Sequence, residues 1–502
     1  MKFKAHAYFF AAVTGLLLLI AFYFLPFFAF FSFIPLIFVC YGANSIRMEK
    51  SPKQSFALGF TSGFVFSVGL LYWILALQIP NKSWLYAGIL LLFIYYGLCF
   101  GIFTFLVSFL EKRYGKVYLF LIPFVWTTIE FIRSLSSQLG FPWGSLAYTL
   151  TPYPSLVQFL PYTGIHGVTF LIMLVNVLLY YTIVKKKPIV IVAIIAVFAL
   201  DYVWGRRFME ITYSPSLKVA IIQSNIAPEV KLEGNPKYRF ALLDSLSRTV
   251  TNCDLIVWPE TAIPGYMGLG THKEEIITKI VDSLGVPVVA GAARVDFEKS
   301  PPALHNSAYL FIPREGIVGF YDKVYLVPFG ERLPFDDIFP FLRRLHFGQG
   351  DFSPGKNYKV FSIGKGKFST LICFESIFPR LVRQFVRNGA QFLVNITEDS
   401  WFGRTAGPYQ HANMAIFRAI EYRMPLVRCG NSGISFFVFP NGKVEQETRI
   451  FTRRVIVSDI PLKQEETFYA RHGDVFAWAC VILTVLPLCA AIFRRHNKDE
   501  QP

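Results

Sequence analysis

Eight apolar runs, each about as long as a membrane-spanning helix, constrain this chain more than any other feature. A helix needs roughly 20 mostly apolar residues to cross a bilayer. Short segments that contain prolines or charged residues separate the runs, as in "RMEKSPK" and "EKRYGK". We therefore expect a multi-pass membrane protein. The expected spans cover residues 6–24, 26–45, 55–79, 84–110, 117–135, 162–184, 188–205 and 475–493.

The middle of the chain has the composition of a soluble domain. Charged residues make up 16% of the 502 residues, against about 25% in a typical soluble protein. The deficit lies in the apolar runs and not in residues 217–465. The sequence therefore predicts three parts: a bundle of seven transmembrane helices (1–210), a water-facing domain (217–465) and a C-terminal transmembrane helix (475–493).

The distribution of basic residues predicts the orientation. They cluster before the first span, after the second, fourth and sixth, and after the last, while the alternate loops carry few. Because basic loops stay in the cytoplasm, both termini should be cytoplasmic and the domain 217–465 should lie outside. These residues also account for much of the formal net charge of +16, so we expect no nucleic-acid partner. They are Lys2, Lys4, Arg47, Lys50, Lys53, Lys112, Arg113, Lys116, Lys185, Lys186, Lys187, Arg494, Arg495 and Lys498.

Within 217–465, strand-like apolar runs alternate with helical segments. Two of these runs, 305–313 and 316–324, are spaced as a hairpin, and helices are expected over 236–250, 272–284, 377–388 and 408–422. This alternation is typical of a layered α/β domain, here with a partly antiparallel sheet. Functional groups in such folds gather where strands end and loops begin.

Three polar groups follow apolar runs directly: Glu260, Lys323 and Cys373. A thiol attacks an acyl carbonyl as the thiolate, and a nearby carboxylate can take its proton. A lysine ammonium can favour the thiolate and stabilise the oxyanion. Together the three groups make a complete acyl-transfer site that requires no metal and no other cofactor. Their spacing in the sequence shows only that they are distant along the chain.

Several motifs in register resemble one known family. The order "WPE", "K…LVPFGE" and "C-F-E" is similar to that of the nitrilase (carbon–nitrogen hydrolase) superfamily, and its combination with seven spans before and one after resembles the apolipoprotein N-acyltransferases. The resemblance covers nearly the whole chain. The motifs that carry it are "GFPWGSLAYT" (140–149), "IVWPETAIP" (256–264), "DKVYLVPFGE" (322–331), "NITEDSWFG" (395–403), "GPYQHANMAIFRAIEYRMPLVR" (407–428) and "FYARHGD" (468–474).

The resemblance implies a fold and a reaction. The fold would be an αββα sandwich on a membrane-embedded helical bundle in the plasma (inner) membrane. The reaction would be a ping-pong transfer of a fatty acyl chain from a phospholipid, through a thioester on Cys373, to the N-terminal amine of a diacylglyceryl-cysteine apolipoprotein. Glu260 would be the base and Lys323 the oxyanion partner.

The resemblance also implies supporting residues, in catalysis or substrate binding: Glu331, Glu375 and Trp401. From the residues alone, a structural ion-pair role for Glu375 and a packing role for Trp401 stay open. Two positions depart from the family pattern. Phe374 replaces a common tyrosine, which removes a hydroxyl group, and Lys231 is followed by leucine where tryptophan is frequent, which puts a lipid contact there in doubt.

Two other functions remain open at this stage. A membrane-tethered amidase would use the same three residues with water as the acceptor. A transporter or scaffold could carry an inactivated nitrilase domain, although an intact Glu, Lys and Cys set argues against decay. The eight spans and the polar "GFPW" loop favour the acyltransferase over an anchored hydrolase.

Several further residues have competing interpretations. His411 fits an ordinary helix-face residue better than a base, and Arg428 and Asn431 are weaker candidates for bonding the pocket loops. Cys253 and Cys429 are expected to be unpaired. The apolar stretches 263–270 and 335–347 are either core or a lid resting on the bilayer surface.

Overall fold

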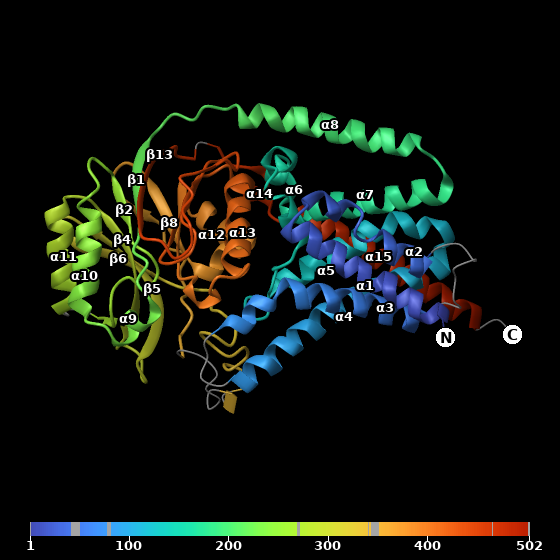
Figure 1. The fold of residues 1–502 in the computed structure, drawn as a ribbon, viewed down its shortest axis with the longest axis horizontal. Helices are drawn as coiled ribbons and strands as arrows, with labels where there is room; N and C mark the ends of the chain where they lie inside the picture. Colours follow the sequence, from blue (N-terminus) through green and yellow to red (C-terminus); the bar gives the residue numbers. More distant parts are fainter. Residues whose placement is uncertain are drawn as a thin grey trace.

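A computed structural model describes residues 2–41, 51–77, 82–268, 272–339, 341–342, 351–463 and 465–499. Its elements form two bodies, a helical bundle and a two-sheet domain, which lie side by side along the long axis (Figure 1). The bundle comprises helices α1 (Lys2–Tyr23), α2 (Ile34–Tyr41), α3 (Pro52–Leu70), α4 (Lys82–Tyr114), α5 (Ile122–Leu135), α6 (Leu160–Thr163), α7 (Ile165–Lys185) and α15 (Val475–Asp499), and α8 (Ile189–Met209) runs along its outside, apart from the packed helices (Figure 1).

Six helices of the described chain are long and apolar enough to cross a membrane, against eight expected. The other two apolar runs do not meet the length and apolarity of a spanning helix, and their own sequences explain why. In 26–45, Pro26 and Pro35 break the run into a 3-10 turn (Pro26–Phe30) and the short α2, while residues 42–50 lie outside the described residues. In 55–79, α3 carries many Ser, Thr and Gly residues and ends before a second 3-10 turn (Tyr72–Ala76). The six candidate spans are Ala5–Tyr23, Lys82–Tyr114, Val117–Leu135, Ile165–Lys185, Ile189–Met209 and Val475–Ile492.

The small residues of α3 allow close helix packing. A Cβ atom at Gly59 would lie 2.3 Å from the Phe100 carbonyl oxygen of α4, and one at Gly63 would lie 2.6 Å from the Tyr96 carbonyl oxygen. Small residues at such interfaces let helix backbones approach each other in a membrane. The weak apolarity of α3 therefore reflects contact with neighbouring helices.

The second body is an αββα sandwich of two mixed sheets (Figure 1). Helices α10 (Pro236–Ser247) and α11 (His272–Leu284) cover the first sheet, and α12 (Pro379–Arg387) and α13 (Gly407–Tyr422) lie between the second sheet and the bundle. The first sheet has the order β13-β1-β2-β4-β5-β6, with β3 (Tyr266–Met267) paired to β4, and the second has the order β12-β11-β10-β9-β8-β7.

The strand bounds follow the apolar runs closely. The first sheet contains β1 (Leu217–Gln223), β2 (Leu255–Val257), β4 (Val288–Asp296), β5 (Ala303–Ile312), β6 (Gly316–Asp322) and β13 (Arg454–Ile460). The second contains β7 (Phe361–Ser362), β8 (Lys367–Ile372), β9 (Phe392–Thr397), β10 (Leu426–Gly430), β11 (Phe436–Val438) and β12 (Val444–Glu445). The predicted hairpin is confirmed, since β5 and β6 pair antiparallel. The antiparallel pairing of β13 with β1 was not predicted.

The chain ends lie on one side of the molecule. Helix α1 begins and α15 ends at the end of the bundle that is farthest from the sheets (Figure 1). Helix α8 runs from that end back toward the sheets and leads into β1.

Candidate active site

Glu260 lies in the loop after β2, and that loop passes directly over β4. A Cβ atom at Gly291 of β4 would lie 2.7 Å from the Glu260 Cα atom and 2.8 Å from the Thr261 backbone nitrogen. Contacts this short do not occur, so only a glycine at position 291 lets the loop that carries Glu260 lie this close to β4.

The Glu260 carboxyl group is buried and only partly hydrogen-bonded. Its Oε1 accepts from Asn306 Nδ2 at 2.8 Å and lies 3.9 Å from Lys323 Nζ. Its Oε2 is buried without a hydrogen-bond partner among the described residues. Burial raises the pKa of Glu260 to about 7, with Lys323 opposing the rise and Glu331 adding to it. A carboxylate with a free oxygen and a pKa near neutrality is suited to accept a proton.

Lys323 follows β6 and is almost completely buried. Its Nζ donates to Glu331 Oε1 at 3.0 Å and lies 2.9 Å from Oε2 of the same residue. Burial works to lower the pKa of Lys323, but the carboxylates of Glu331 and Glu260 outweigh it and raise that pKa above its usual value. The ammonium group therefore stays charged.

Cys373 is the first residue after β8, and its backbone φ of 52° is left-handed. Burial raises the pKa of its thiol, the Glu260 charge raises it further, and Lys323 lowers it. The structure thus places the three predicted residues, Glu260, Lys323 and Cys373, close enough for the charges of Glu260 and Lys323 to shift the pKa of the Cys373 thiol. A thiol whose pKa is raised reacts as a nucleophile only when a base takes its proton.

Glu331 forms hydrogen bonds with three separate parts of the site. Its Oε1 accepts from Asn306 Nδ2 at 2.8 Å, and its Oε2 accepts from the Val327 backbone N–H at 2.8 Å. With its two contacts to Lys323, this carboxylate connects the lysine, the loop 327–331 and β5.

Glu375 is fully buried and bonds to backbone on both sides of the site. Its Oε1 accepts from the Tyr321 hydroxyl at 2.7 Å and from the N–H groups of Val324 at 2.7 Å and Tyr325 at 3.1 Å, while its Oε2 accepts from the Ile372 N–H at 2.8 Å. These contacts join the turn after Lys323 to the end of β8. The geometry supports a positioning role for Glu375.

The other predicted positions lie nearby. Trp401 is half-buried in the 3-10 turn Ser400–Phe402. Phe374 packs against Phe141 of the bundle, with ring centroids 6.4 Å apart. Lys231 forms an ion pair with Glu398.

The predicted lid segments are only partly described. In the segment 335–347, Ile338, Phe339 and Phe341 are exposed, and residues 340 and 343–347 lie outside the described residues. In the segment 263–270, Tyr266 is exposed, Ile263 and Met267 are buried, and residues 269–270 lie outside the described residues. Cys253 and Cys429 are both free, as expected.

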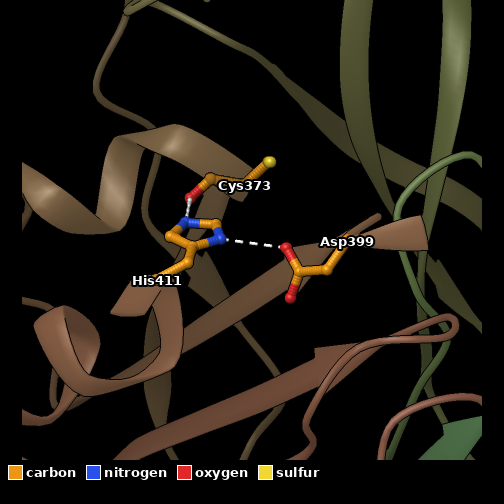
Figure 2. Close-up of side chains that lie close together, drawn as sticks. All are labelled: Cys373, Asp399 and His411. Atoms are coloured by element: carbon orange, nitrogen blue, oxygen red, sulfur yellow. Dashed lines mark hydrogen bonds and ion pairs between the residues drawn. The ribbon is translucent and has the colours of Figure 1, made fainter. Parts of the chain in front are cut away.

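Asn306 was missed from the sequence, and His411 and Arg428 were considered there but given minor roles. Asn306 of β5 donates to both Glu260 and Glu331, and its only sequence signal is a polar residue in an apolar strand. Behind Cys373, His411 of α13 contacts the cysteine backbone and Asp399 (Figure 2). Arg428 of β10, a weaker candidate above, donates to Asp399 Oδ2 at 2.9 Å.

Cys373, Asp399 and His411 could be mistaken for metal ligands, because their ligand atoms lie within 4.8 Å of one another. The charges argue against it. The Arg428 guanidinium already binds the Asp399 carboxylate, and the cysteine sulfur points away from the imidazole (Figure 2). A buried guanidinium beside these atoms would repel a cation.

Known protein families match both the sheet domain and the helical bundle. Residues 218–469 match the carbon-nitrogen hydrolase family, and residues 14–178 match the apolipoprotein N-acyltransferase N-terminal domain. Among solved structures, the chain is similar to an amidase from Nesterenkonia sp. (19% identity, 54% of this chain and 95% of that one, TM-score 0.38). It is also similar to Saccharomyces cerevisiae Nit3 of the nitrilase superfamily (17% identity, 52% and 95%, TM-score 0.40).

Curated relatives extend over nearly the full length. The apolipoprotein N-acyltransferase of Geobacter metallireducens is 36% identical over 94% of this chain and 92% of its own. That of Chlorobaculum tepidum is 32% identical over 77% and 79%, and that of Thermotoga maritima is 27% identical over 93% and 90%. The chain is a multi-pass membrane acyltransferase, and it belongs to the apolipoprotein N-acyltransferase family.

Proposed function

We propose that this acyltransferase moves a fatty acyl chain from a phospholipid, through a thioester on Cys373, to the N-terminal amine of a diacylglyceryl-cysteine lipoprotein. The observation that carries the proposal is the buried Glu260–Lys323 pair within electrostatic reach of the Cys373 thiol. It supplies a base with a pKa of about 7 beside a permanent cation.

In the first half-reaction, the Cys373 sulfur attacks the ester carbonyl of the phospholipid while Glu260 takes the thiol proton. Lys323 stabilises the oxyanion that develops on the carbonyl oxygen. When the intermediate collapses, the ester C–O bond breaks, the lysophospholipid oxygen takes the proton from Glu260, and the thioester remains.

In the second half-reaction, the lipoprotein amine attacks the thioester carbonyl. Glu260 takes a proton from the nitrogen, the C–S bond breaks, and the departing thiolate receives that proton. The products are an amide and the free thiol, so each cycle restores the starting enzyme without a cofactor. Glu331, Glu375 and Trp401 serve as supporting residues, the two glutamates by holding Lys323 and the backbone around it.

The proposed location is the plasma (inner) membrane, with 217–465 as the extracytoplasmic catalytic domain, 1–210 as the transmembrane bundle and 475–493 as a last span. The basic loops support this orientation. So does the position of both chain ends at the face of the bundle that is farthest from the sheets.

The test is to incubate the purified protein with a phospholipid in detergent and to measure the mass of the intact chain by mass spectrometry. An acyl adduct should form, should be absent in Cys373→Ala, and should disappear when a diacylated lipopeptide is added, as the N-acylated lipopeptide appears. An adduct that persists in Cys373→Ala refutes the nucleophile. Release of free fatty acid with no lipopeptide product would instead support the membrane-tethered amidase.

A further inference from the structure

The backbone of Cys373 has an unusual conformation that its surroundings must hold. A left-handed φ of 52° is strained at a residue with a side chain and persists only where neighbouring groups fix it. The Cys373 carbonyl oxygen accepts two hydrogen bonds, from His411 Nε2 at 3.1 Å and from Ser376 Oγ at 3.1 Å. Figure 2 shows that the sulfur points away from the imidazole. The ring therefore contacts the backbone of the nucleophile and leaves its sulfur free.

Both ring nitrogens of His411 face hydrogen-bond acceptors, Nε2 the Cys373 carbonyl oxygen and Nδ1 the Asp399 carboxylate. A carbonyl oxygen can only accept, so the contact of Nε2 with Cys373 is a hydrogen bond when Nε2 carries a hydrogen. At the other ring nitrogen, Nδ1 lies 2.9 Å from Asp399 Oδ1 and 3.1 Å from Arg428 Nη2. A charged ring donates at both nitrogens. A neutral ring with its hydrogen on Nε2 accepts from Arg428 at Nδ1, whereas a neutral ring with its hydrogen on Nδ1 donates to Asp399 and leaves Nε2 to accept from Ser376 Oγ, 3.4 Å away. The first two states contain the Nε2–H bond to Cys373, and the third lacks it.

The groups around His411 are themselves fixed. Arg428 is fully buried and donates to Asp399 Oδ2 and to Asn395 Oδ1. Burial alone would raise the pKa of Asp399, but Arg428 and His411 hold it at about 2. The carboxylate therefore stays charged and keeps both partners. On the ring face, Trp143 of the bundle stacks at a centroid distance of 5.9 Å and 27° between planes.

We propose that His411 is a positioning residue, whose Nε2–H group holds the Cys373 carbonyl and so fixes the backbone conformation that directs the sulfur toward Glu260 and Lys323. This inference rests on the proposed function, because it needs Cys373 as the nucleophile. His411 takes no proton in the reaction and touches no substrate.

Two substitutions separate this role from simple packing. In His411→Gln, the amide nitrogen reaches the former position of Nε2 and can still donate to the carbonyl. In His411→Asn, the shorter amide reaches only the position of Nδ1, beside Asp399. We expect His411→Gln to form the acyl adduct within about threefold of the wild-type rate, and His411→Asn about 10–100-fold more slowly.

The measurement is the single-turnover rate of adduct formation at saturating phospholipid. The phospholipid concentration that gives half of this rate is measured separately and is called half-saturation. A positioning role lowers the rate and leaves half-saturation unchanged. Each rate is divided by the fraction of folded protein, which is measured by thermal unfolding in detergent. If His411→Asn does not fold, His411→Phe replaces it as the ring without a donor.

Equal rates for the glutamine variant and the variant without the donor, whether both high or both low, overturn the inference. Failure of the proposed function is distinct, because the wild type itself would then form no adduct on Cys373.

Discussion

The pH at which Cys373 becomes acylated should depend on Glu331, although Glu331 takes no part in proton transfer. Glu260 accepts the thiol proton only when ionised, and its pKa is about 7. The rate of adduct formation should therefore rise through about pH 7 and then level, because the raised pKa of Lys323 keeps the ammonium charged. The negative charge of Glu331 is one cause of the raised pKa of Glu260, so the change Glu331→Gln should lower that pKa.

The structure gives the size of the effect. The Oε1 atoms of Glu260 and Glu331 both lie 2.8 Å from the same Asn306 nitrogen. They are therefore less than about 6 Å apart, where two unit charges at an effective dielectric of about 20 repel by about 3 kcal/mol, equivalent to about two pH units. Neutralising Glu331 also leaves Glu260 as the remaining carboxylate beside Lys323, which acts in the same direction. We expect the midpoint to fall by about one to two pH units.

The assay is adduct formation followed by intact mass at limiting phospholipid, between about pH 5 and pH 9. The matched control is Glu445→Gln, which removes one negative charge from an exposed ion pair with Lys443 in the same domain and should leave the midpoint in place. An unchanged or raised midpoint in Glu331→Gln, with the control unchanged, would refute the electrostatic coupling of the two carboxylates.

Three further changes test other parts of the site. Lys323→Arg keeps the charge but places a planar fork in a buried ammonium site, so adduct formation should fall by about 100-fold or more in the same assay. Gly291→Ala puts a Cβ atom 2.7 Å from the Glu260 Cα atom, and it should slow adduct formation about tenfold or more without preventing assembly of the bundle. Gln410→Leu leaves two buried indole N–H groups unbonded and should lower the free energy of unfolding by about 2–5 kcal/mol, measured by denaturation in detergent.

The sequence predicted most elements of the sheet domain and the place of the three candidate catalytic residues at the ends of strands. The four predicted helices of the domain correspond to α10, α11, α12 and α13, and Glu260, Lys323 and Cys373 each follow a strand. These predictions succeed because apolar periodicity and the ends of strands are local properties that a single stretch of sequence carries.

The missed features depend on distant pairings. Asn306 reaches Glu260 only because β5 lies beside β4 in one register, and β13 closes the first sheet against a strand more than 200 residues earlier. His411 looks like a helix-face residue until Cys373, Asp399 and Arg428 converge around it. Such convergence is a property of the tertiary fold and leaves no local signal.

The loop 140–143 of the bundle contacts the residues around Cys373. Phe141 packs against Phe374, the residue after Cys373, and Trp143 stacks on His411. Gln410, next to His411 on α13, accepts from the indole nitrogens of Trp73 at 3.0 Å and Trp143 at 2.6 Å. In the proposed reaction, the thioester on Cys373 needs protection from water until the amine arrives. The bundle supplies these aromatic side chains, so the surroundings of Cys373 are built from residues of both bodies.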